Sequence, residues 1–112
     1  MDLIQAVQEF SKLSFQEQKE KLIVMIEQIK DADTMFLDLF TLLQKGENID
    51  SNFLVDIYHD IMEFGQAIQT YNTTKQQIVL LSLQKKLQEI HEREKKERTI
   101  EQQEIEELIK NI

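Results

Sequence analysis

The sequence of 112 residues contains no cysteine, no proline, no tryptophan and only two glycines. Without cysteine the chain cannot form disulfides, thiolate metal sites or a cysteine nucleophile. The shortage of proline and glycine removes the residues that tight β-turns and phosphate-binding loops require, which excludes a β-sandwich and a glycine-rich nucleotide fold. The commonest residues are Gln, Glu, Ile and Leu, and this composition favours helix. The sequence therefore predicts an all-α fold.

Long apolar runs and an excess of positive charge are also lacking. No apolar stretch approaches the roughly 20 residues of a membrane span, and the N-terminus lacks the basic flank and apolar run of a signal peptide. With 13 basic against 21 acidic side chains, the formal charge of -8 opposes nonspecific attraction to nucleic acid or to anionic lipid. We therefore expect a cytoplasmic protein that binds neither nucleic acid directly nor a membrane.

Charge and aromatic content divide the chain into two parts. Residues 1–74 hold 13 acidic and 5 basic side chains, whereas residues 75–112 hold 8 of each. Every aromatic side chain precedes residue 72. An aromatic-rich, acidic part is typical of a compact core, and an aromatic-free part of mixed charge is typical of an exposed or oligomeric helix.

The first part has the apolar spacing of short amphipathic helices. One helix is expected over about residues 2–12. A second begins at Ser14, because Ser14 and Glu17 form a capping box, and ends near Asp31-Ala32. A third, apolar around much of its circumference, is expected to be capped by Asp33.

Gly46 is expected to end the third helix in left-handed backbone geometry, and Asp50 to cap a fourth. The apolar residues of the fourth helix are separated alternately by three and four positions, which is typical of a helix packed lengthwise against its partners. They are Leu54, Ile57, Ile61, Phe64, Ile68 and Tyr71. Gly65 lies among them and weakens the helix by about 1 kcal/mol relative to alanine. We interpret it as a place where a neighbouring helix crosses closely.

A long helix should start at Thr73 or Thr74, since each fits a capping box. Its apolar residues thin out along the chain, and none lies between His91 and Arg98. A further capping box at Thr99 could start a separate final helix, or the long helix could continue to about residue 110. We favour the continuous helix, because opposite charges three and four residues apart stabilise an exposed helix.

The predicted architecture is a bundle of four short helices plus a long C-terminal helix. Residues 1–90 would form the bundle, and residues 91–112 a projecting extension. The apolar residues of the extension are too many to leave exposed on an isolated helix, so we expect them to pack against a second chain in a homodimer. The interface is predicted to contain Leu83, Leu87, Ile90, Ile100, Ile105, Leu108, Ile109 and Ile112.

The nearest approach to a metal site is Asp56, His59 and Glu63, which share one face of the fourth helix. A di-metal bundle needs an acidic-x-x-His element on each of two helices, but Gln88 stands where a carboxylate would precede His91. The arrangement is incomplete. We therefore expect a solvated polar face, with no metal and no cofactor.

Two charged clusters lie on the long helix. The acidic one could face a single cation but has no second carboxylate set to complete the site; it comprises Glu101, Glu104, Glu106 and Glu107. The basic one lacks aromatic residues and is interrupted by glutamates; it comprises Lys85, Lys86, Arg93, Lys95, Lys96 and Arg98. We expect both to be solvated helix faces, although the basic cluster could instead meet the acidic part of another subunit.

Three classes of function fit these features. The favoured one is a small, non-enzymatic protein–protein interaction module, of adaptor, chaperone-like or inhibitory type, that acts as a homodimer and binds a further protein. The second is an acidic regulator that masks the basic surface of a nucleic-acid-binding partner, as an antitoxin or DNA mimic would. The third is a metal-dependent helical-bundle enzyme that uses Asp56, His59 and Glu63 or the terminal glutamates.

Overall fold

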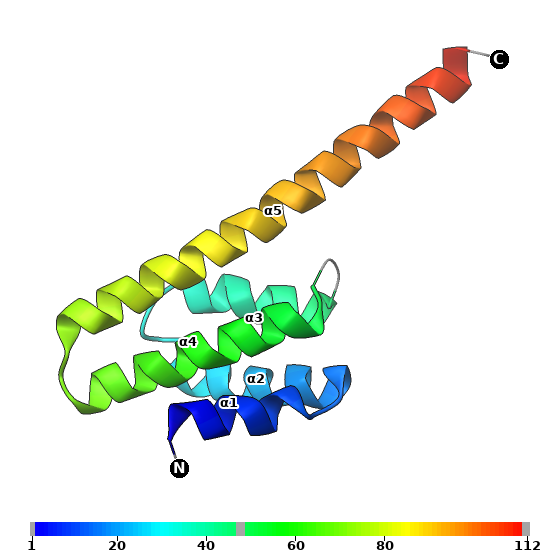
Figure 1. Cartoon of the computed structure of the whole chain (residues 1–112). Coiled ribbons are helices and arrows are strands. Elements are labelled where there is room, and N and C mark those ends of the chain that lie inside the picture. Colours follow the sequence, from blue (N-terminus) through cyan, green and yellow to red (C-terminus); the bar gives the residue numbers. More distant parts are fainter. Residues whose placement is uncertain (1, 47–48, 111–112) are drawn as a thin grey trace.

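The computed structural model describes residues 2–46 and 49–110, and for residues 97–100 the backbone alone. Within these ranges the chain forms five α-helices and no strand, which confirms the predicted all-α fold (Figure 1). The helices are α1 (Leu3–Ser11), α2 (Phe15–Ile29), α3 (Met35–Lys45), α4 (Ser51–Gln69) and α5 (Thr73–Lys110).

Local capping chemistry sets most of the helix boundaries. At the start of α2 the Glu17 N–H donates to Ser14 Oγ over 3.2 Å, and the Ser14 hydroxyl donates to Glu17 Oε1 over 2.9 Å. Asp50 caps α4 by accepting a hydrogen bond of 2.8 Å from the Phe53 N–H. Gly46 ends α3 with a φ of 67°, a left-handed geometry that glycine adopts without steric penalty. These three predictions are confirmed.

Asp33 supplies the capping hydrogen bond of α3, as predicted, because its side chain accepts from the Met35 N–H over 2.9 Å; the residue directly before Met35, Thr34, makes no side-chain capping bond. The start of α5 at Thr73 also agrees with the prediction, but its cap does not. The long helix is capped by Asn72, whose Oδ1 accepts from the Lys75 N–H over 3.0 Å, rather than by a threonine hydroxyl. Because α5 then continues to Lys110, the alternative of a separate final helix is wrong.

The core lies where α1 to α4 and the first half of α5 meet. Every helix contributes a buried side chain, among them Phe10, Leu22, Phe36, Ile57 and Leu83. The rings of Phe36 and Phe64 join α3 to α4 with their centroids 5.4 Å apart.

Tyr58 joins α4 to α1, because its ring stacks on that of Phe10 with a centroid separation of 4.1 Å. Burial, and secondarily the charge of Glu9, raise the pKa of Tyr58 above its usual value. Both effects disfavour the phenolate, so this residue stays neutral in the folded bundle at neutral pH.

Gln18 is a fully buried polar residue that ties three helices together. Its side-chain amide donates to the Phe10 carbonyl over 3.1 Å, and its Oε1 accepts from the Ser51 hydroxyl over 2.9 Å. A buried amide is tolerated because both of its ends are hydrogen-bonded.

The lengthwise packing of α4 ends earlier than the spacing predicts. Leu54, Ile57, Ile61 and Phe64 are buried, whereas Ile68 is 41% and Tyr71 89% exposed. The expected close crossing at Gly65 is also wrong, since a Cβ built there meets nothing within 4 Å. Instead, Gly65 borders a hollow of about 320 Å³ between α2 and α4.

The second half of α5 leaves the bundle and projects away from it (Figure 1). Ile90 is 2% exposed, and beyond it no side chain that the structure describes is buried. The molecule measures 63 × 29 × 20 Å, with a radius of gyration of 17.2 Å. A compact chain of this length would have a radius of gyration of about 13 Å. The difference reflects the projecting helix.

Candidate interaction surface

The projecting half of α5 carries three large apolar side chains that the chain itself does not cover. Ile105, Leu108 and Ile109 are 56%, 66% and 64% exposed. Leu108 and Ile109 follow Ile105 by three and four residues, so the three side chains form one stripe along the helix. We call it the distal stripe. Ile100 and Ile112, which the sequence assigns to the same interface, lie outside the residues whose side chains are described.

The distal stripe repeats the face of α5 that packs on the bundle. Ile105 follows Leu87, and Leu108 follows Ile90, by 18 positions in each case, which is five full turns of an α-helix. The two pairs therefore point to the same side of the helix axis, about 27 Å apart along it. Leu87 and Ile90 cover the core, whereas the second half of α5 extends past the other described helices (Figure 1).

The predicted interface must accordingly be shortened at its N-terminal end. Leu83, Leu87 and Ile90 are 0%, 5% and 2% exposed because they pack in the core of their own chain. A second chain could reach them only if the bundle opened. Of the described members of the predicted interface, only the distal stripe is available.

A second exposed apolar pair, Ile78 and Leu81, lies on the outer face of the first half of α5. These residues are 56% and 64% exposed, nearly the same values as Ile105 and Leu108. Here, however, the opposite face of the helix is already fixed by the core. Isolated exposed apolar residues on a supported helix are common in monomeric proteins, so this pair requires no partner.

The most buried charged residue, Asp60, holds α4 to α5. Its carboxylate accepts a hydrogen bond of 3.0 Å from the Ser82 hydroxyl and forms an ion pair with Lys86. Ser82 and Lys86 are one turn apart on α5, so both reach the same carboxylate. Sequence reasoning missed this site, although Asp60 stands between Ile57 and Phe64 on the buried side of α4, and a carboxylate in an apolar stripe needs a partner.

The candidate metal ligands do not assemble into a cluster. His59 contacts Asp60 (Nδ1 to Oδ1, 3.6 Å) and Glu63 (Nε2 to Oε1, 3.3 Å), while Glu63 is also paired with Lys75 (Oε2 to Nζ, 3.2 Å). The exposed Asp56 is not among these contacts. In the part of the chain that the structure describes, no three His, Asp or Glu side chains are placed to share a metal ion. The face instead forms ion pairs across the α4–α5 contact.

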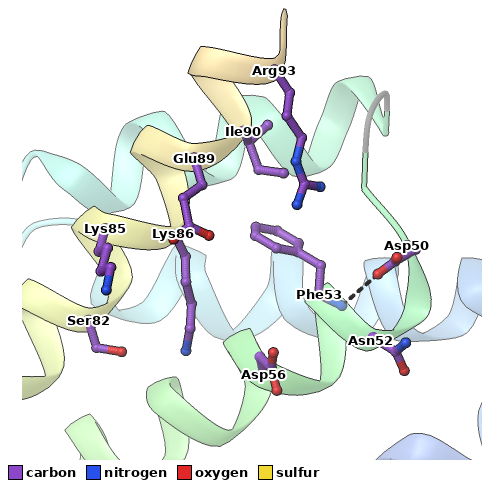
Figure 2. Close-up of a pocket in the computed structure, with 10 residues that line it drawn as sticks. All are labelled: Asp50, Asn52, Phe53, Asp56, Ser82, Lys85, Lys86, Glu89, Ile90 and Arg93. Atoms are coloured by element: carbon purple, nitrogen blue, oxygen red, sulfur yellow. Dashed lines mark hydrogen bonds between the residues drawn. The ribbon is translucent and has the colours of Figure 1, made fainter.

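A hollow of about 450 Å³ lies between the start of α4 and the middle of α5 (Figure 2). Phe53 and Ile90 form an apolar wall, and the remaining lining residues are mostly charged. Three are cationic and three are acidic: Lys85, Lys86, Arg93, Asp50, Asp56 and Glu89. Because these charges balance, the hollow does not select for a phosphate or for a cation.

Comparison of the chain with protein-family models, curated proteins and solved structures gave no match. Within the described residues, none of the helices combines the length and the apolar character that crossing a bilayer requires. The function must therefore be inferred from the surface of the chain itself, and above all from the distal stripe.

Proposed function

We propose that this chain is a small, non-enzymatic protein–protein interaction module, of adaptor, chaperone-like or inhibitory type, that acts as a homodimer through the projecting half of α5. The distal stripe carries this proposal. It presents three large apolar side chains, each more than half exposed, on the part of α5 beyond Ile90, where no described side chain is buried.

Packing of the distal stripe against a partner would stabilise the projecting half of α5. An isolated helix is only marginally stable in water, and most helix stability in proteins comes from packing an apolar face. Residues 91–110 gain some support from side-chain contacts such as that between His91 Nδ1 and Glu94 Oε2, which are 3.8 Å apart and form an ion pair only when the imidazole is protonated. Such exposed pairs contribute at most a few tenths of a kcal/mol.

The expected strength follows from the apolar area. Burying a fully exposed Ile or Leu side chain contributes about 1.5–3 kcal/mol. The six side chains in a dimer are 56–66% exposed, so together they contribute on the order of 5–10 kcal/mol. Association costs roughly 4–15 kcal/mol in lost freedom of motion. The balance favours a reversible dimer whose population depends on protein concentration.

Sedimentation equilibrium over a range of concentrations tests the proposal. The variant Leu108→Gln removes about 2 kcal/mol of apolar burial per copy and should weaken dimerisation by roughly a thousandfold. Leu81→Gln is a matched control, since Leu81 is 64% exposed and Leu108 66% exposed on the same helix. Deleting residues 92–112 should give a folded monomer, because the core ends at Ile90.

A wild-type chain that stays monomeric up to millimolar concentration would contradict the proposed dimer. The same holds if the truncated chain remains dimeric, or if Leu81→Gln disrupts association as strongly as Leu108→Gln. The last result would move the interface to the outer face of α5.

A further inference from the structure

The charges of the projecting half are distributed unevenly along its length. Residues 91–96 hold three basic and two acidic side chains, a net charge of +1: Arg93, Lys95, Lys96, Glu92 and Glu94. Residues 101–110 hold four acidic side chains and one basic side chain, a net charge of -3: Glu101, Glu104, Glu106, Glu107 and Lys110. All ten are exposed except the half-buried Glu94.

We infer that two copies of the chain pair antiparallel along residues 91–110. This inference rests on the proposed function, to which it adds the orientation of the partner. In a parallel pair the four glutamates of one copy would lie beside the same four glutamates of the other. In an antiparallel pair that overlaps at residues 91–110, Glu104, Glu106 and Glu107 are level with positions 97, 95 and 94, beside Arg93, Lys95 and Lys96 of the partner subunit. Attraction between unlike segments and repulsion between like segments therefore favour the same orientation.

The apolar residues fit the same arrangement. Each copy has buried apolar residues up to Ile90, a polar stretch, and then the distal stripe. Ile90 is buried in its own core, so a partner cannot pack on it. Antiparallel overlap of residues 91–110 sets Leu108 of one copy level with Arg93 of the other, beside the hollow whose apolar wall includes the half-buried Phe53. The distal stripe can pack there and on the alkyl stems of the basic side chains without opening either bundle.

Reversing charges at Glu104 and Glu107 separates the two orientations by the sign of the effect. In Glu104→Lys/Glu107→Lys the distal segment changes from -3 to +1. An antiparallel pair then sets +1 against +1, and its dissociation constant should rise about tenfold or more at low salt. A parallel pair would instead lose the repulsion of -3 against -3 and become tighter.

A compensating variant provides the matched control. Adding Arg93→Glu and Lys96→Glu to the first two changes makes residues 91–96 net -3, opposite a distal segment of +1. Relative to the double variant, antiparallel association should tighten and recover to within about threefold of wild type, whereas a parallel pair should weaken from the double variant back to the wild-type level, because -3 then faces -3 in residues 91–96. All four positions are exposed, and only Arg93 borders the bundle, at the hollow beside Phe53. Circular dichroism should therefore show similar thermal melting of the bundle in the double and the fourfold variants.

A distance measurement gives an independent readout. The chain has no cysteine, so Lys110→Cys carries a single spin label. Labels in an antiparallel pair overlapping at residues 91–110 are separated by about 30 Å, whereas a parallel pair would hold them within about 15 Å. The short distance, or tighter association of the first variant, would overturn the antiparallel pairing and leave the interaction module standing. A monomeric wild type would overturn both.

Discussion

The bundle and the projecting half of α5 are connected by one continuous helix, but they differ in whether their apolar side chains are buried. Leu83 and Leu108 are the same residue type on the same helix, yet one is 0% and the other 66% exposed. The aromatic residues and buried polar contacts of the first 72 residues close the bundle on itself. The projecting half has an apolar stripe of equal character and no neighbour. An amphipathic pattern thus shows that a helix has an apolar face, but it does not show whether another part of the chain packs against that face.

Hydrogen exchange should give the largest contrast between the two regions. Amides in the core-facing part of α5 open only when the bundle unfolds, whereas amides of residues 101–110 open by local fraying. In dilute solution we expect protection to differ by about a thousandfold or more, since global stability is typically 5–15 kcal/mol. Mass spectrometry of exchanged peptides measures this.

Raising the protein concentration should change the exchange protection of only one region. Protection of residues 101–110 should rise as the dimer forms, while protection of the bundle stays unchanged. Equal protection of both regions in dilute solution would mean that the projecting half is stabilised within the monomer, which would remove the reason for a partner.

Truncating the two leucines should give the next largest difference. Leu83→Ala leaves a cavity in the core and should lower the free energy of unfolding by about 3 kcal/mol. Leu108→Ala should change it by less than about 0.5 kcal/mol when measured below the dimerisation range. Urea denaturation with a helical signal measures both variants. A large loss in Leu108→Ala at low concentration would show that its side chain packs within its own chain.

Substitutions of Asp60 and Asp56 should show a similar difference between the buried and the exposed face of α4. Asp60→Ala leaves Ser82 and Lys86 without their acceptor and should cost about 2 kcal/mol of stability. Asp56→Ala, one turn earlier and exposed, should be within about 0.5 kcal/mol of wild type. If both variants lost the same stability, the polar face would act as a single network that includes Asp56, contrary to the observed contacts.

The smallest effect concerns the glycines of the bundle. A methyl group at Gly65 meets no atom within 4 Å, so Gly65→Ala should stabilise the fold by about 1 kcal/mol through helix propensity. Gly46→Ala should destabilise it by about 1 kcal/mol, because Gly46 has a φ of 67°. Thermal unfolding of the two variants should shift in opposite directions. A destabilised Gly65→Ala would mean that the hollow beside Gly65 is closed in the native protein.

Much of the local structure could be predicted from neighbouring residues. Ser14 with Glu17, Asp50 and Gly46 each act through atoms within four positions, so their capping geometry follows from short-range sterics and hydrogen bonding. The residues of the distal stripe also belong to the interface that the sequence predicts. The cap of α5 is wrong by one position, because Asn72, Thr73 and Thr74 are neighbouring polar residues that offer similar acceptors.

The contacts between helices could not be predicted in this way. Asp60 precedes Ser82 by 22 residues and Lys86 by 26, and nothing local shows that they meet. From the sequence alone, the helix face at Leu87 and Ile90 cannot be distinguished from the face at Ile105 and Leu108, because both have the same apolar spacing.

Most helix boundaries, the amphipathic character of α5 at both ends and the distribution of charge along it can therefore be predicted from the sequence. Where the face of α5 finds a neighbour depends on the folded bundle, since this face packs on the core up to Ile90 and is exposed at Ile105 and Leu108. The two kinds of information differ in their range along the chain. Capping and periodicity depend on residues within one or two turns, whereas the cover of a helix face depends on where the bundle ends.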